Sequence, residues 1–150
     1  GMLPARENCV FQEGKPLLGI CVGMQLMADF SEEQGLHDGL SWIGGSVKKM
    51  KKHLESNVRV PHVGWNDVVF KENFGLIKSG EVIAFYFDHS FAYQNPELGE
   101  ELAFCWHGCK FTAIIKKENI VAVQFHPEKS QSAGIRFLKS FLKLVFPYYH

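Results

Sequence analysis

The chain has 150 residues, the length of one domain, and its 16 basic and 16 acidic residues give a formal net charge of zero. A neutral chain is not expected to bind nucleic acid through bulk positive charge, and no apolar run approaches the roughly 20 residues needed to span a membrane. The four cysteines match neither a paired CxxC zinc pattern nor a dense disulfide framework, so we expect reduced thiols and a cytoplasmic protein.

The first expected element is a short apolar stretch, Pro16–Ile20, which is typical of a strand covered on both faces. Apolar residues between Val22 and Phe30 indicate a helix directly after it, and the four glycines of Gln34–Ser46 predict a loop. A short helix is expected over Glu72–Lys78. Further strands are expected at Val58–Phe70, Val82–Phe87, Leu102–Trp106, Phe111–Ile115 and Ile120–Phe125.

The last part of the chain predicts a turn and a helix. Lys117-Glu118-Asn119 separates two of the strands, and Ser132–Phe146 carries apolar residues at offsets of three and four, as an amphipathic helix does. Strands buried on both faces and followed by helices imply an α/β fold. We expect residues 1–150 to form a single domain.

A cysteine stands between two glycines where the first strand passes into the first helix, in the sequence GICVG. A sharp strand-to-helix turn would lift Cys21 above the edge of the sheet, as the elbow of hydrolases does for its nucleophile. The start of the helix favours a thiolate, and the N–H of Val22 can point at an oxyanion. The alternative is a buried cysteine with a structural role only.

A cysteine nucleophile needs a base and an orienting group, and the sequence VQFHPEKS provides both after an apolar strand. Pro127 forces His126 into an extended conformation, so that Glu128, two residues on, can reach the imidazole and fix its tautomer. The alternative is a surface His-Pro-Glu turn. Structural roles are expected for His62 and His89, with lining of the site as the second interpretation.

Together these motifs resemble class I (triad-type) glutamine amidotransferases. Within that class, the stretches GMQLM, PHVGWN, FYFDHSFAY and FHPEKSQ are similar to the glutaminase subunit of imidazole glycerol phosphate synthase, the HisH family. The resemblance runs from about Gly14 to Phe146 and implies a flavodoxin-like three-layer α/β sandwich. It also implies no metal or organic cofactor.

The resemblance assigns a role to each motif. Cys21 would attack the side-chain amide of L-glutamine and form a thioester, His126 would protonate the departing ammonia, and Glu128 would hold His126. Water would then release glutamate, and the ammonia would pass to the cyclase subunit (HisF-like) in histidine biosynthesis. Residues implied for substrate and oxyanion binding are Val22, Gln25, His89 and Ser90. Those implied for the cyclase interface are Trp65, Tyr86 and Lys129.

Two departures from the family pattern shape further expectations. Nothing in the sequence matches the glycine-rich PGVG loop that supplies a second oxyanion donor, so the N-terminal part of the family domain is expected to be absent. Loss of such a donor costs roughly 3–4 kcal/mol in comparable enzymes. We therefore expect little activity from this chain alone, and self-association through the open side of the sheet. The second departure is Asp88, which stands where the family has an apolar residue.

Two alternatives to a HisH-type glutaminase remain at this stage. One is a HisH paralogue that supplies ammonia to a surface-sugar amidotransferase. The other is a catalytically silent fragment or assembly module that keeps the motifs without turnover.

Overall fold

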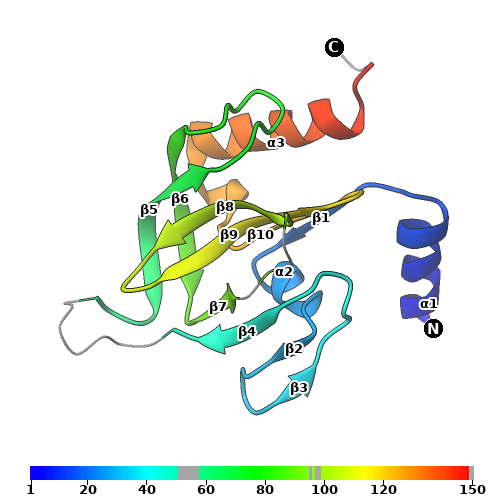
Figure 1. Ribbon diagram of the computed structural model, residues 1–150, viewed down its shortest axis with the longest axis horizontal. Coiled ribbons are helices and arrows are strands. Elements are labelled where there is room, and N and C mark those ends of the chain that lie inside the picture. Colours follow the sequence, from blue (N-terminus) through cyan, green and yellow to red (C-terminus); the bar gives the residue numbers. More distant parts are fainter. Residues whose placement is uncertain (51–57, 95, 97–98, 149–150) are drawn as a thin grey trace.

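The computed structural model describes residues 1–50, 58–94, 96 and 99–148, which form two β-sheets and the helices that pack on them (Figure 1). The larger sheet has six strands in the order β1-β10-β9-β8-β5-β6. Its strands are β1 (Leu17–Ile20), β5 (His62–Phe70), β6 (Val82–His89), β8 (Glu101–Trp106), β9 (Lys110–Lys117) and β10 (Ile120–Val123). All five strands expected from the sequence on the C-terminal side of residue 57 therefore occur.

The larger sheet is mixed, with one parallel pair among its described strands. This pair is β1 and β10. Parallel neighbours need a long crossover connection, and the connection between these two strands passes through most of the chain. The connection from β9 to β10 is the expected turn, in which Glu118 takes a φ of 51°. Such a two-residue connection can join only antiparallel neighbours.

A smaller sheet of four short strands has the order β3-β2-β4-β7. Its strands are β2 (Phe30–Ser31), β3 (His37–Asp38), β4 (Ser46–Lys49) and β7 (Phe91–Gln94). The loop expected over Gln34–Ser46 thus contains β3 and the first residue of β4. Strands of two residues are too short to show an alternating hydrophobic pattern, so no pattern in the sequence predicted β2 and β3.

The helices agree with the sequence at the C-terminus and differ from it elsewhere. They are α1 (Met2–Glu7), a π-helical turn η1 (Asn8–Gln12), α2 (Val22–Leu26), a 3-10 turn η2 (Pro127–Lys129) and α3 (Gln131–Val145). The expected closing helix is confirmed by α3. The expected first helix stops at Leu26, because the chain turns there to enter the smaller sheet.

The helix expected over Glu72–Lys78 is wrong. Phe74 and Ile77 form an isolated antiparallel bridge instead, and Gly75 between them takes a φ of 57°. A side chain at Gly75 would collide with the backbone of Ser140 at 2.4 Å, so this turn packs tightly against α3. Burial of Phe74 and Ile77 in that contact outweighs the weak helical pattern of the segment.

The elements form three layers (Figure 1). On one face of the larger sheet, α3 inserts Phe137 against Phe85 and Phe125, whose rings stack at 3.9 Å. On the other face, Met24 of α2 and Tyr93 of the smaller sheet form a second apolar cluster. This arrangement confirms the expected α/β three-layer class. No helix in the described part of the chain has the length and apolarity to cross a membrane.

Candidate active site

Cys21 follows β1 directly and has an unusual backbone conformation, with φ at 50° and ψ at −103°. Its N–H donates to the carbonyl of Val123 at 2.7 Å, so the turn is anchored to β10. A Cβ at Gly19 would lie 2.6 Å from Met27 Cε, which explains the first glycine of GICVG, whereas Gly23 has open space around it. A cysteine at positive φ between strand and helix is the backbone geometry of a nucleophile elbow.

The sulfur of Cys21 is nearly buried and lies among polar groups. Gln124 Nε2 donates to Sγ at 3.5 Å, the backbone N–H of Val22 also bonds it, and the thiol donates to the carbonyl of Asp88 at 3.9 Å. Burial raises the pKa of the thiol, the two N–H donors oppose that effect, and the carboxylates of Asp88 and Glu128 add to it. The thiolate expected from the sequence is therefore not favoured here. The helix dipole does little to oppose this, because α2 is only five residues long.

His126 and Glu128 lie just beyond β10 and form an ion-pair geometry. His126 Nδ1 and Glu128 Oε1 are 2.6 Å apart, and His126 is extended at φ −102° and ψ 98°, as Pro127 requires. The segment is fixed to β6, because the N–H of His126 donates to the carbonyl of Tyr86 at 2.9 Å. Ser130 completes the attachment: its hydroxyl donates to the carbonyl of His126 and accepts the N–H of Tyr86.

The parallel pairing of β1 and β10 brings the two motifs to the same edge of the sheet. Ile20 is in register with Val123, so Cys21 and His126 both follow strand ends at that edge. The described hydrogen bonds of the two residues do not include one between Cys21 Sγ and the imidazole. The role of His126 as the base for Cys21 therefore stays a prediction.

Gln25 lies one helical turn after Cys21, and its side chain is turned into the protein. Its amide nitrogen donates to the carbonyl of Phe91 at 3.0 Å and to Gln124 Oε1 at 3.1 Å. The amide nitrogen of Gln25 is thus engaged with the protein, whereas the family resemblance implied that Gln25 would contact the substrate.

His89 and Ser90, expected to clamp the substrate through their backbone, connect β6 to β7. His89 is 6% exposed; its Nδ1 lies 2.7 Å from the carbonyl of Phe91 and its Nε2 lies 2.8 Å from His62 Nδ1. The carbonyl of Ser90 accepts the N–H of Met50 at 3.0 Å.

The buried imidazoles are strongly shifted toward the neutral form. Burial, together with neighbouring imidazoles that include His107, lowers the pKa of His62 to about 3 and that of His89 to about 4. The ring of His107 stacks on His62 at 3.8 Å between centroids. Two neutral histidines that hydrogen-bond each other agree with the expected structural role.

The three residues expected at the cyclase interface lie together: Trp65 and Tyr86 share one face of β5 and β6, and Lys129 of η2 lies beside them. Trp65 pairs with Tyr86, with ring centroids 6.2 Å apart, and Lys129 lies 5.9 Å above the ring of Tyr86. Lys129 Nζ also lies 4.0 Å from Asp88. Val63 and Trp65 are about half exposed, at 53% and 48%, so an apolar patch with adjacent charges is open to solvent.

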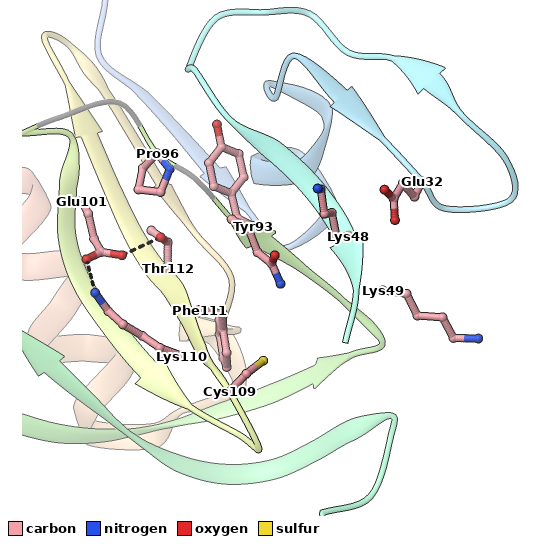
Figure 2. A pocket seen from close by; sticks show the side chains of 11 residues that line it. Glu32, Lys48, Lys49, Tyr93, Pro96, Glu101, Cys109, Lys110, Phe111 and Thr112 are labelled. Carbon is pink, nitrogen blue, oxygen red and sulfur yellow. Dashed lines mark hydrogen bonds and ion pairs between the residues drawn. The ribbon is translucent and has the colours of Figure 1, made fainter. Parts of the chain in front are cut away.

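A cavity of about 650 Å³ opens on another part of the molecule, between the smaller sheet and β9 (Figure 2). Its lining is Glu32, Lys48, Lys49, Tyr93, Gln94, Pro96, Glu101, Cys109, Lys110, Phe111 and Thr112. None of the residues assigned to the site from the sequence lines this cavity. Figure 2 shows its Glu101 carboxylate already paired with Lys110 and Thr112.

The sequence did not assign roles to Gln124 and Ser130, although both belong to the quoted motifs. Both side chains are fully buried, and they contact Cys21 and His126 respectively. The other cysteines lie elsewhere: Cys9 and Cys109 are partly exposed, and Cys105 is buried in β8. Burial raises the pKa of the Cys105 thiol to about 12.

Comparison with known proteins agrees with this geometry. The family model for class I glutamine amidotransferases matches residues 3–144, and the chain belongs to that family. It is 46% identical to imidazole glycerol phosphate synthase subunit HisH of Zymomonas mobilis over 94% of this chain and 65% of that protein. The HisH subunit of Rhodospirillum rubrum is 40% identical over 95% of this chain and 67% of that protein.

A solved structure shows the same fold. The crystal structure of a glutamine amidotransferase superposes with a TM-score of 0.65 at 19% identity, covering 95% of this chain and 67% of that chain. The chain thus spans about two thirds of the length of the relatives it matches.

Proposed function

We propose that this chain is a HisH-type glutaminase subunit that hydrolyses L-glutamine to glutamate and ammonia. The observation that carries the proposal is the elbow at Cys21 on the sheet edge that also presents the His126–Glu128 pair. The similarity to HisH subunits of 36–46% identity favours histidine biosynthesis over a surface-sugar paralogue. Localisation in the cytoplasm accords with this role.

The chemistry begins with a neutral thiol. Cys21 Sγ transfers its proton to His126 and attacks the amide carbon of glutamine, forming a C–S bond. The amide nitrogen takes the proton from His126 as the C–N bond breaks, so that ammonia leaves and a thioester remains. Water, deprotonated by His126, then attacks the thioester; the C–S bond breaks, and glutamate and the thiol are released.

The groups around the sulfur suit the negative charges of these steps. The N–H of Val22, which already bonds Sγ, is the candidate donor to the oxyanion. Glu128, held at Nδ1 of His126, favours the tautomer that leaves Nε2 free to exchange protons with Cys21, and stabilises the imidazolium.

The proposed partner is the cyclase subunit of imidazole glycerol phosphate synthase, and the patch of Val63, Trp65, Tyr86 and Lys129 is its proposed contact. Half-exposed aromatic and apolar side chains beside a Lys129–Asp88 pair are the composition of a protein interface. Trp65→Ala would then weaken binding of a cyclase at least tenfold. Leu144→Ala, on the exposed side of α3, is the control and would leave the affinity unchanged.

The test of the proposed function is glutamate release, measured with and without a HisF-type cyclase and its ligand. We expect little turnover alone and a clear stimulation by the cyclase, both lost in Cys21→Ala. Equal turnover in Cys21→Ala would refute the thioester mechanism. An absence of turnover with several cyclases, with a folded chain that binds them, would favour the silent assembly module.

We also propose that two copies associate through β1, which lies at the edge of the larger sheet (Figure 1). Leu17 and Cys21 donate their N–H groups to the β10 side, so those of Leu18 and Ile20 point away from it. The adjoining groove of about 710 Å³ is mostly apolar, with Arg6 as one of its two charged residues. Antiparallel pairing of two β1 strands would satisfy these groups.

Sedimentation of the wild type and two variants tests the association. Leu18→Pro removes an N–H directed away from β10 and obstructs an added strand, so it should be monomeric. Leu18→Ala keeps the backbone and should still associate. A monomeric wild type at tens of micromolar, or identical behaviour of all three proteins, would exclude pairing through β1.

A further inference from the structure

A chain of hydrogen bonds runs through the interior and ends on the sulfur of Cys21. Gln124, fully buried after β10, places Nε2 at 3.5 Å from Sγ. Its Oε1 accepts an N–H from Gln25 at 3.1 Å, and the same Gln25 nitrogen donates to the carbonyl of Phe91 at 3.0 Å. Two side-chain amides therefore connect a backbone carbonyl of β7 with the nucleophile.

The orientation of both amides follows from the acceptor at the far end. The carbonyl oxygen of Phe91 can only accept, so Gln25 must turn its NH₂ group toward it. That NH₂ group also faces Gln124, which must then present its oxygen. The NH₂ group of Gln124 is left facing Cys21 Sγ, and rotating either amide by 180° would oppose two donors or two acceptors.

The carbonyl of Phe91 is itself fixed by a second chain. His89 Nδ1 lies 2.7 Å from it and must carry the proton, so His89 Nε2 accepts from His62 Nδ1 at 2.8 Å. His62 Nε2 then accepts from Asn66 Nδ2 at 3.1 Å, and Asn66 Nδ2 also donates to the carbonyl of Trp106 at 2.8 Å. Every contact is satisfied when both imidazoles are neutral.

We propose that Gln124 is a catalytic residue that stabilises the Cys21 thiolate through its Nε2–H, and that Gln25 is a positioning residue that orients Gln124. The inference rests on the proposed role of Cys21 as the nucleophile. In the thiol, Sγ–H points to the carbonyl of Asp88 while the sulfur accepts from Gln124. When the proton leaves, the N–H groups of Gln124 and Val22 remain on the negative sulfur.

The charged groups that face Cys21 make this donor important. The carboxylates of Asp88 on β6 and Glu128 on η2 both disfavour a thiolate, as does burial of the sulfur. Lys129 Nζ lies 4.0 Å from Asp88, but both side chains are about half exposed, so solvent screens this cation and it offsets only part of the carboxylate charge. The thiolate therefore depends on the two N–H donors that contact it directly.

The test measures the rate at which iodoacetamide alkylates Cys21 as a function of pH, by peptide mapping of the full chain. Gln124→Glu keeps the shape and the bond from Gln25 but replaces the donor by an oxygen. We expect the apparent pKa of Cys21 to rise by about one unit and alkylation at neutral pH to slow about tenfold, as for loss of a hydrogen bond to a charged group. Gln124→Leu should shift it in the same direction, and Gln94→Leu should not.

Gln25→Leu provides a second route to the same answer, because it removes the group that orients Gln124 and leaves Gln124 itself in place. We expect a smaller rise in the same apparent pKa. In the cyclase-supported assay, Gln124→Glu should lower kcat with KM little changed. An unchanged alkylation profile in Gln124→Glu and Gln25→Leu, with both proteins folded, would overturn the proposal.

The alkylation readout does not require turnover, so the two proposals fail separately. Normal glutamate release that depends on Cys21, together with unshifted profiles, would remove the role of Gln124 and leave the glutaminase intact. Shifted profiles in a chain whose glutamate release does not depend on Cys21 would refute the thioester mechanism. Gln124 would then remain only a hydrogen-bond donor to the Cys21 sulfur.

Discussion

The two sides of the candidate active site are built in different ways. On the side of the nucleophile, Cys21, Gln25 and Gln124 are at most 8% exposed and belong to one directional set of hydrogen bonds. On the side of the base, the His126 side chain is 18% exposed and its partner Glu128 is 54% exposed. The first side is placed by the same packing that forms the core, and the second is held by a contact open to solvent.

The difference indicates which properties of the site depend on folding and which depend on surface charge. Buried hydrogen bonds are costly to leave unmade, so changes near Cys21 should affect stability together with reactivity. An exposed ion pair is weakened by water and salt, so changes at Glu128 should affect the reaction more than the fold. The following three predictions, in order of decreasing effect, test this contrast.

The largest effect is expected for His126→Ala. A general acid and base contributes typically 10²–10⁴ in rate, so we expect cyclase-supported glutamate release to fall about 10³-fold. The pH profile of Cys21 alkylation should shift less than in Gln124→Glu, because the hydrogen bonds to the sulfur come from Gln124 and Val22. A His37→Ala control, at an exposed position, should keep full activity. An alkylation profile shifted as far as in Gln124→Glu would contradict this contrast. It would show that His126 controls the ionisation of Cys21 as strongly as the buried amides do.

The second prediction concerns acid stability. Burial lowers the pKa of His62 to about 3 and of His89 to about 4, whereas unfolded histidines titrate near pH 6.5. Between these pH values the unfolded chain binds more protons than the folded chain. The stabilisation that comes from the two neutral imidazoles is therefore complete above about pH 6.5 and is lost as the pH falls from there toward about 4. We expect the unfolding free energy to fall by several kcal/mol between about pH 6.5 and pH 4.5.

His62→Gln tests the source of that pH dependence by urea unfolding at several pH values. The variant should be less stable than the wild type at pH 7 but should lose on the order of 2 kcal/mol less on acidification, because one shifted histidine is gone. His37→Gln is the matched control and should keep the wild-type slope. Equal slopes in wild type and His62→Gln would show that the imidazole pair does not control acid unfolding.

The smallest effect is expected for Glu128→Gln. The amide oxygen of glutamine can still accept from His126 Nδ1, and only the charge is lost, so we expect glutamate release to fall about tenfold. The unfolding free energy should change by less than about 0.5 kcal/mol. Glu72→Gln, on an exposed turn, serves as the control. A loss as large as that of His126→Ala would mean that the partner shields this pair from water.

Much of the larger sheet could be predicted from the sequence because its strands are long or strongly apolar. Ile120–Val123 is buried throughout, and α3 shows a clear helical period. The smaller sheet could not be predicted, since Phe30–Ser31 and His37–Asp38 are defined by their pairing with neighbours and not by a pattern of their own.

The same division applies to the site. Cys21, His126 and Glu128 stand out because their motifs combine a chemical group with a local backbone constraint. The role of Gln124 depends on the register in which Ile20 pairs with Val123, about a hundred positions away in the chain, and no local signal carries it. Ser130 acts through the docking of η2 on β6, which is likewise a tertiary property.

Because Cys105 is buried in β8, its alkylation can report opening of the fold. Its thiol is fully buried and has a pKa of about 12, so a soluble alkylating reagent can modify it only when the strands around it separate. In one peptide map, the alkylation rate of Cys105 therefore reports unfolding, and the alkylation rate of Cys21 reports the reactivity of the nucleophile. The same experiment would therefore show, for each variant, whether the protein was folded when the reactivity of Cys21 was measured.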